Sequence, residues 1–463
     1  MLSVDREDIT QGPLGRALLL VAAPLIAQNL VQIANQVVDV FWLGRLSEDA
    51  VAGVGLVIPV LGVAYALLAV GFVGTQVVVA QRAGEDDRPG LRRAAVNGLG
   101  LSVAVGLATG AVTAALAPSL VGLLVPGAAV AAFAVPYLTV YALGFPVLFA
   151  SDSLEAGLVG VGDTRGAFLI NVLAVGLNIL LDPVLIFGWF GAPALGVRGA
   201  ALATVIGYGA GFVLGLGLVR GGRQGLRYTR DALTVDGGTL REIVDVGLPN
   251  AGQSLGQQAA RVAVVGVVSA TGGAAGLAAY TIGMRVASVA VIPAIGLQQA
   301  AQSVVGQNLG ADQPARAGRA TWLGVAIAVA GLSVLGVAQW LAPGPLVGLF
   351  VPGASAAAAA LSVDYLRILA YGYPGLGATY LLLAGFNGAR RTRTSMVATL
   401  LQYWAVRVPV AAAGGLWLGF GVHAAFWAIT LSNLVAAVGA GWYYRWKTAD
   451  GMLRRSAAEA TGG

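Results

Sequence analysis

A carboxylate inside an apolar stretch near the start of the chain is the first residue that could do chemistry. It is Asp39, and the surrounding segment 28–46 (QNLVQIANQVVDVFWLGRL) has the character of the outer part of a membrane-spanning helix. A charged side chain in the bilayer costs about 2.5–3.5 kcal/mol on insertion scales, so it usually serves transport. The alternative hypothesis is that Asp39, about one turn from the helix end, only lies at the membrane interface.

A second carboxylate, Asp182, lies in a later apolar stretch with Asn178 four residues before it. Residues at this spacing share one helix face. Counted from the expected outer turns at about 1.5 Å per residue, these residues, Thr204 and Tyr137 all lie in the outer half of the membrane. Oxygen atoms of this kind suit Na⁺, and two neighbouring carboxylates can instead share a proton. We therefore predict a site for a small cation or a proton, Na⁺ or H⁺, at Asp39, Asn178, Asp182 and Thr204, with no other cofactor.

Some of these polar residues also have purely structural interpretations. Asn178 and Thr204 could form ordinary hydrogen bonds between helices, and Tyr137 could pack at the interface. Asp152 and Glu155 lie near the inner end of their expected span, where they could reach cytoplasmic water.

Charged residues in the second half of the chain are interpreted as structural. Asp364 and Arg367 are three residues apart and are expected to pair. Arg261 and Arg407 are expected to be structural, and His423, the single histidine, is expected at an outer surface turn.

The composition is that of a membrane protein. Of the 463 residues, 57% are hydrophobic and only 10% are charged, with a mean hydropathy of +0.81, whereas about 25% charged is usual in soluble domains. No cleavable signal is evident in residues 1–13, and the absence of cysteine excludes disulfides and thiol chemistry. Basic cytoplasmic loops explain the net charge of +6, so nucleic acid is not expected as a partner.

The apolar pattern predicts an all-α polytopic membrane protein with twelve transmembrane helices. Each apolar run is long enough to span a hydrocarbon core of about 30 Å. The expected spans are 14–43, 50–80, 92–118, 129–157, 166–190, 197–220, 241–268, 275–306, 315–342, 355–386, 394–418 and 421–446. The expected domains are an N-terminal tail (1–13), a first lobe (14–220), an Arg-rich linker (221–240), a second lobe (241–446) and a C-terminal tail (447–463).

Basic residues predict the orientation in the membrane. Arg45 and Arg198 lie in expected outer loops and four arginines lie within spans, whereas the remaining 21 of the 27 Lys and Arg residues lie in the other loops and the tails. Cytoplasmic loops carry such an excess. Both termini of this multi-pass protein of the cell membrane are therefore expected in the cytoplasm, as are the tails and the linker.

The two halves of the chain repeat one another. LAPSLVGLLVPGA at 116–128 matches LAPGPLVGLFVPGA at 341–354, and AGLVGVGDTR at 156–165 matches AGFNGARRTR at 384–393. The offset of 225–228 residues is constant enough to indicate six spans duplicated in the same orientation. We expect two pseudo-symmetric six-helix bundles with the substrate path between them.

The duplicated positions differ in chemistry. Four of the five acids well inside spans lie in the first half. Val264 and Val408 occupy the positions that correspond to Asp39 and Asp182. The ion site is therefore expected in the first half only.

Longer stretches around these residues resemble the multidrug and toxic compound extrusion (MATE) family. They include PNAGQSLGQQ at 249–258, AAYTIGMRVASVAVIPAIGLQQAAQSVVGQNLGA at 278–311 and NILLDP at 178–183. The resemblance covers nearly the whole chain and implies the MATE fold. Within the family the chain looks like the DinF-type branch of archaea and many bacteria.

The resemblance implies roles for individual residues. In the DinF-type branch, a set of polar residues lines a cavity of the first lobe. The matching positions here are Asp39, Asn178, Asp182, Thr204 and Tyr137. Asn35 and Gln28 are expected to line the substrate cavity beside Tyr137, and Pro24 matches a proline where bending has been proposed to accompany protonation. The NorM-type branch instead carries acids in spans seven and ten, but here Gln257 occupies the span-seven position, so a sodium site in the second lobe is doubtful.

What the family implies is antiport by a protein that is not an enzyme. Inward movement of H⁺ or Na⁺ drives export of amphipathic, often cationic, organic compounds such as drugs, dyes and toxic metabolites. Two lobes alternate access across the lipid bilayer, and a monomer is expected.

Two other functions compete with antiport. A flippase for lipid-linked oligosaccharides has a related architecture, but it usually needs more spans and a more cationic cavity than Asp39 and Asp182 provide. A membrane-embedded enzyme is the more remote alternative, because one histidine and no cysteine leave few pairs of nucleophile and base.

The arginine distribution predicts the sidedness of single-cysteine variants. Cysteines placed at Arg227 and Arg391 are expected to react with an impermeant thiol reagent only from the cytoplasmic side, and one at Gly127 only from outside. Labelling is measured in whole cells and inverted vesicles. Reaction of the Arg391 position from outside would contradict the twelve-span topology.

Overall fold

The computed structural model describes residues 6–124, 128–222, 225–227, 234–350 and 355–460. Gly127, part of the predicted linker and the extreme ends of both predicted tails lie outside these residues. Within the described residues the chain is helical, with no strand. It divides into two compact units, one formed by Met1–Asp8 and Ala23–Ala251 and the other by Ile9–Ala22 and Gly252–Gly463.

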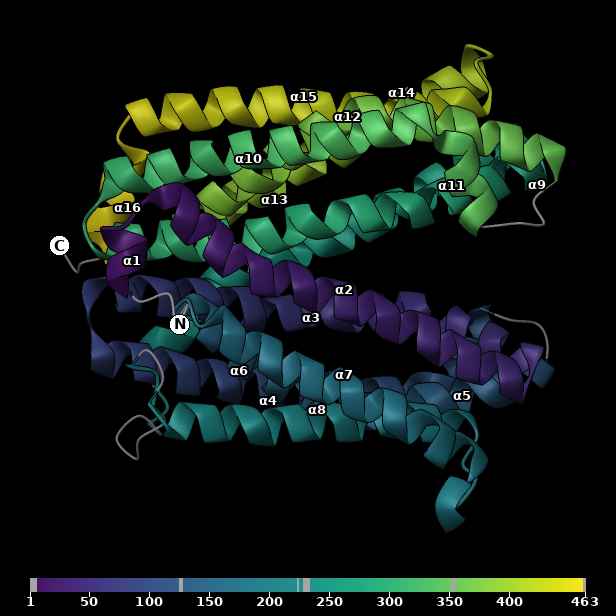
Figure 1. The fold of residues 1–463 in the computed structure, drawn as a ribbon, viewed down its shortest axis with the longest axis horizontal. Helices are drawn as coiled ribbons and strands as arrows, with labels where there is room; N and C mark the ends of the chain where they lie inside the picture. Colours follow the sequence, from purple (N-terminus) through teal and green to yellow (C-terminus); the bar gives the residue numbers. More distant parts are fainter. Residues whose placement is uncertain (1–5, 125–127, 223–224, 228–233, 351–354, 461–463) are drawn as a thin grey trace. The chain divides into compact units, whose positions relative to one another are not determined.

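Figure 1 shows the helices of each unit running alongside one another. The helices up to the linker are α1 (Arg6–Thr10), α2 (Leu14–Leu46), α3 (Glu48–Glu85), α4 (Arg88–Leu124), α5 (Ala128–Leu143), α6 (Phe145–Gly160), α7 (Thr164–Phe187), the 3₁₀ turn η1 (Trp189–Gly191) and α8 (Val197–Arg220). Those that follow are α9 (Gly237–Gly310), α10 (Pro314–Leu341), α11 (Pro343–Phe350), α12 (Ala356–Gly388), α13 (Thr392–Leu400), the π-helix η4 (Leu401–Arg407), α14 (Val408–Ala412), the π-helix η5 (Ala413–Trp417), α15 (Val422–Ala449) and α16 (Met452–Ala460).

Helices occupy all twelve predicted spans. Among the described residues, eight helices are long and apolar enough to cross a membrane, and up to ten segments are if each of two bent pairs forms one span. Span four is such a pair, α5 and α6, bent by 52° around Gly144. Spans seven and eight are merged in α9, which breaks at Gly273, where φ is 55°. Predicted spans seven and ten are also helical, in the first part of α9 and in α12 respectively. Neither is among the segments just counted as able to cross a membrane.

The duplication is visible in the backbone of the turns that follow α6 and α12. Gly162 and the corresponding Arg390 both adopt left-handed conformations, with φ of 88° and 58°. The amide of each bonds the carbonyl three residues earlier, at 3.0 and 2.9 Å. The second copy therefore keeps a turn that favours glycine even though it carries an arginine.

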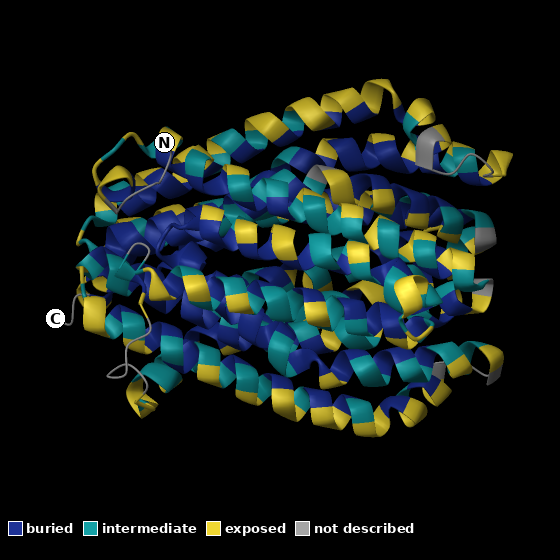
Figure 2. Ribbon diagram, turned by 60° about the horizontal axis from the view of Figure 1, so that its bottom comes forward, coloured by how far each residue is buried: buried dark blue, intermediate teal, exposed yellow. Residues whose placement is uncertain are grey.

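The outward faces of the helices are suited to lipid. Large apolar side chains are strongly exposed on them, for example Ile58, Leu180, Val262, Val334 and Val438 at 62–73%. Figure 2 shows how exposed residues alternate with buried ones along individual helices. Apolar surface on this scale is expected of a protein whose solvent is the bilayer.

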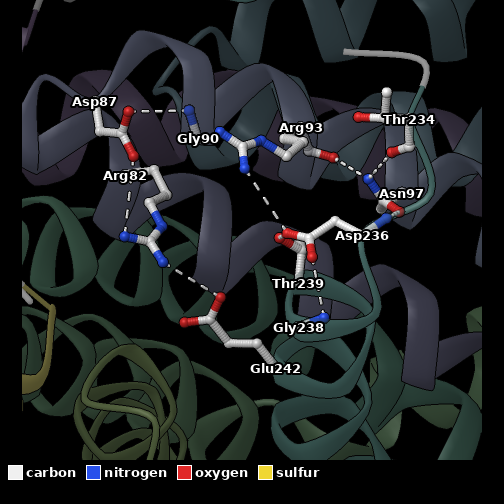
Figure 3. A network of polar contacts seen from close by, with 10 residues as sticks. All are labelled: Arg82, Asp87, Gly90, Arg93, Asn97, Thr234, Asp236, Gly238, Thr239 and Glu242. Atoms are coloured by element: carbon white, nitrogen blue, oxygen red, sulfur yellow. Dashed lines mark hydrogen bonds and ion pairs between the residues drawn. The ribbon is translucent and has the colours of Figure 1, made fainter. Parts of the chain in front are cut away.

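Polar contacts attach the end of the linker to α4 (Figure 3). The Nδ2 of Asn97 donates to the carbonyl of Thr234 at 3.1 Å, and its Oδ1 accepts from the amide of Asp236 at 3.0 Å. Hydrogen bonds from Thr239 and then from Gly238 lower the pKa of Asp236 below its usual value. Asp236 thus remains charged at the N-terminus of α9, where a negative charge is favourable.

A close approach of α3 and α9 within the first unit depends on two glycines. A Cβ added at Gly247 would collide with the carbonyl oxygen of Val70, and one added at Gly74 would collide with that of Ile243. Backbone atoms cannot move aside as a flexible side chain can, so these helices pack at this distance only with glycine at both positions.

Gly247→Ala is therefore expected to destabilise the protein by about 1–3 kcal/mol, the usual range for overpacking. The matched control is Gly100→Ala, because nothing lies within 4 Å of a Cβ added there. Thermal unfolding in detergent, followed by circular dichroism, compares the two variants. Equal midpoints would contradict the close approach.

Candidate functional site

Three predicted site residues come together on α7 and α8. Asp163 caps the start of α7, where its Oδ1 accepts from the amide of Gly166 at 3.0 Å. One face of α7 then presents Asn178 and Asp182, both buried. Thr204 of α8 lies 3.3 Å from Asn178, measured from Oγ1 to Nδ2. The predicted i and i+4 relation of Asn178 and Asp182 is thus realised, with Nδ2 to Oδ1 at 3.4 Å.

The helix α2 brings Asn35 and Asp39 to the same place. Nδ2 of Asn35 lies 3.4 Å from Oδ2 of Asp39. Both the nitrogen and the oxygen of the Asn178 amide find hydrogen-bond partners when the nitrogen faces α2. The nitrogen then donates to Asn35 Oδ1 at 2.7 Å and to Asp39 Oδ1 at 3.2 Å. In this orientation its oxygen accepts from the amide and hydroxyl of Thr204 at 3.1 and 3.3 Å. In the opposite orientation its nitrogen instead faces Asp182 and Thr204, at the distances given above.

The two carboxyl groups lie within hydrogen-bonding reach of each other. A hydrogen bond between two carboxyl groups needs a proton on one of them. Asp182 is only 1% exposed, and within the described part of the chain its Oδ2 has no donor from the protein. A proton or a cation between Asp39 and Asp182 would satisfy this atom.

The oxygen atoms gathered here suit an alkali cation as well as a proton. Carboxylate oxygens of Asp39 and Asp182, the amide oxygen of Asn178 and the hydroxyl of Thr204 are hard ligands of the type that Na⁺ prefers. The described residues contain no group of three or more His, Cys, Asp and Glu side chains that could hold a metal ion. The donor atoms of this cluster therefore suit H⁺ or Na⁺.

Tyr137 extends the site along α5. It is 9% exposed and lies close enough to both carboxyl groups for their charges to act on it. Its ring stacks on Tyr141 with centroids 5.7 Å apart, and the hydroxyl of Tyr141 lies 2.9 Å from that of Tyr65. Sequence reasoning missed Tyr141, although its i+4 spacing from Tyr137 is a signal that could have identified it.

Gln28 contacts a different acid. Its Nε2 donates to Oε1 of Glu155 on α6 at 2.5 Å, and no hydrogen bond among the described residues joins it to Asp39. Glu155 is only 6% exposed, so it does not reach bulk water from the end of its span as its position in the sequence indicated. The remaining oxygen of Gln28 is buried without a partner in the described part of the protein.

Two further predictions concern Pro24 and Asp364. The helix α2 continues through Pro24, so any bend there is not a break in the helix. Asp364 pairs with His423, whose Nε2 lies 3.2 Å from Oδ2, and the expected ion pair with Arg367 is not formed among the described residues. His423 lies near the start of α15 with 44% of its side chain exposed, which agrees with the predicted surface turn.

The fold and this site define a helical membrane protein built from two repeats with an acidic cluster in one of them. The MatE family model matches the chain twice, over residues 24–184 and 249–413. The chain therefore belongs to the MatE family, and its all-helical MATE fold is confirmed.

Related proteins and structures extend over nearly the whole chain. A probable multidrug resistance protein NorM of Pseudomonas putida is 30% identical over 93% of this chain and 94% of its own length, and one of Pseudomonas aeruginosa is 28% identical over 96% and 92%. An outward-facing structure of a MATE family transporter superposes with a TM-score of 0.90 at 24% identity, covering 96% of this chain and 98% of that one. A MOP superfamily transporter from Pyrococcus furiosus gives 0.89 at 24%, covering 96% and 97%.

Tryptophan fluorescence should report sodium binding at the cluster, because Trp42 lies three residues after Asp39 and packs edge-on against Trp189 at 5.7 Å. If Na⁺ is bound, Asn178→Ala and Thr204→Val should weaken the response markedly by removing ligands. If the acids only share a proton, both variants should change the pH dependence alone. Absence of a saturable response to Na⁺ in the wild type at every pH from about 6 to 8, above the reference carboxyl pKa values, would leave proton coupling.

Proposed function

We propose that this protein is an ion-coupled antiporter that exports amphipathic, often cationic, organic compounds. Its family is one of transporters rather than enzymes, and the relatives reported above are multidrug resistance proteins. The observation that carries the proposal is the pair of membrane-embedded carboxyl groups, Asp39 and Asp182, which lie close together beside Asn178. Placing two carboxyl groups in the membrane costs free energy, and binding of the coupling ion explains why the protein keeps them there.

The coupling follows from competition at this cluster. In one state Asp39 and Asp182 hold H⁺ or Na⁺, with the oxygen atoms of Asn178 and Thr204 as further ligands. A drug and an ion that favour different states of the protein weaken each other's binding, so inward movement of the ion drives release of the drug. Tyr137, Asn35 and Gln28 are proposed to line the drug cavity of this unit.

Pro24 is proposed as the hinge of α2. The two compact units divide this helix between Ala22 and Ala23, directly before the proline. A proline removes the hydrogen bond to the carbonyl four residues earlier, here that of Leu20, so the helix bends most easily at this point.

Assignment to the DinF-type branch is also a proposal. The curated relatives cited above bear the name NorM, but Gln257 stands where that branch carries an acid in span seven. The acidic cluster of the first unit is the feature that favours the DinF-type assignment. We further propose a monomer in the cell membrane with both termini, the linker and both tails in the cytoplasm, as the arginine distribution indicates.

The asymmetry of the two repeats gives the test. Asp39→Asn and Asp182→Asn, each reconstituted in liposomes, are expected to abolish dye efflux driven by a pH or Na⁺ gradient, because an amide cannot bind and release the ion. The matched controls at the duplicated positions are Val264→Thr and Val408→Asn, which are expected to keep most of the activity. Val264 is only 1% exposed, so the nearly isosteric threonine is used there.

Circular dichroism and melting temperature of all four variants establish that they are folded. Equal loss of efflux at the four positions would remove the case for an ion site in the first unit. Turnover of a lipid-linked sugar across the bilayer without ion-driven dye efflux would identify a flippase instead.

A further inference from the structure

Two arginines of the second unit lie deep within predicted spans. Arg407 is ten residues before Trp417, the end of its span, and Arg261 is twelve residues before the break at Gly273. At about 1.5 Å per residue, both guanidinium groups belong roughly 15–18 Å below the outer ends of their helices. A charge at this depth is costly and usually faces a partner or a water-filled path.

A wide helical turn presents Arg407. The π-helix η4 ends at this residue, and Pro409 follows two positions later. Pro409 has no amide hydrogen to bond the carbonyl of Ala405, which lies inside the wide turn. Such turns are frequent at functional sites.

Neutral groups hold Arg407 in place. Its Nε donates to Oγ of Ser432 at 2.8 Å, and its Nη2 donates to Oδ1 of Asn433 at 2.8 Å. The guanidinium lies over the ring of Tyr403, 4.0 Å from its centroid. The side chain is therefore fixed, but none of these partners neutralises its charge.

Arg261 shares the surroundings of Arg407. Both guanidinium groups act electrostatically on the same three phenols, those of Tyr280, Tyr365 and Tyr380. The ring of Tyr280 stacks on that of Tyr365, with centroids 5.8 Å apart. Arg261 is exposed rather than sealed in the bundle, so a ligand can reach it.

Neither arginine has a counter-ion in the described part of the chain. The ion pairs among the described residues of the second unit use other basic residues: Asp364 pairs with His423, Glu459 with Arg391, and Asp450 with Lys447 and Arg455. Two positive charges without a carboxylate partner among the described residues make this region of the membrane strongly attractive to an anion.

We propose that Arg261 and Arg407 form a binding site for the carboxylate of an aromatic, amphipathic substrate. This rests on the proposed function, since it names a part of the substrate that the transporter recognises. A guanidinium fork binds a carboxylate through paired, charge-assisted hydrogen bonds. The tyrosines supply flat apolar surfaces on which the aromatic part of the substrate stacks. The transporter therefore accepts zwitterionic and anionic amphiphiles as well as cations.

Two dyes that differ only in the carboxylate test the proposal. Rhodamine 110 has a free carboxylate, and rhodamine 123 is its methyl ester. Fluorescence anisotropy measures the Kd of each for the purified protein in a neutral detergent. The ratio of the two Kd values, ester over acid, isolates the contribution of the carboxylate from that of the shared ring system.

Arg261→Gln and Arg407→Gln are each expected to lower this ratio by about tenfold, the loss of one charge-assisted hydrogen bond. Arg407→Lys, which keeps the charge without the fork, should lower it less. The matched control is Arg285→Gln, since Arg285 is an exposed arginine of α9 that does not act on these three tyrosines. Its ratio should equal that of the wild type.

The outcomes separate this site from the proposed function. Rhodamine 123 has no carboxylate, so its ion-driven efflux from proteoliposomes tests antiport alone, and its retained affinity shows that a variant is folded. Arg261→Gln provides the test if Arg407→Gln does not fold. An unchanged ratio in Arg261→Gln, or an equal loss of affinity for both dyes, would overturn the anion site even where efflux of rhodamine 123 is normal.

Discussion

The cost of placing a charge in hydrocarbon governs this protein. Every charged side chain within its spans must be paired, neutralised by a proton or ion, or reached by water. The first unit meets this constraint with acids that contact one another and neutral amides: Asp39 and Asp182 lie beside Asn178, and Glu155 contacts Gln28. None of these acids is paired with an arginine among the described residues. In the proposed mechanism their neutralisation depends on a proton or cation from outside the protein, which is what coupling requires.

The second unit meets the same constraint with the opposite charge. Arg407 is held by Ser432 and Asn433 and lies over Tyr403, and none of these groups is acidic. Duplication preserved the backbone closely enough to keep a left-handed turn at both Gly162 and Arg390. The side chains that determine charge were free to diverge because they do not build that backbone. One fold thus holds an acidic cluster in one repeat and a basic, aromatic one in the other.

The sequence predicted most of the fold because the bilayer imposes strong rules on it. Long apolar runs placed the twelve helices, and the i and i+4 spacing of Asn178 and Asp182 placed both on one face of α7. Contacts between distant segments could not be read in this way. The pairing of Gln28 with Glu155 joins residues 127 positions apart, and Asp364 meets His423 rather than the nearer Arg367. The π-helix η4 depends on how the turn before Pro409 packs, for which apolar periodicity carries no signal.

The division of the chain into units follows from the same duplication. The first unit ends inside α9 at Ala251, and the second unit includes residues of α2 up to Ala22. Both divisions fall beside prolines at duplicated positions, Pro24 and Pro249, in the matching segments APLIAQNL and LPNAGQSL. Each proline leaves the carbonyl four residues before it without its helical hydrogen bond, so the backbone is weakest where it passes from one unit to the other. The first helix of each repeat is therefore the element that both units share, and Asp39 lies on one of these two helices.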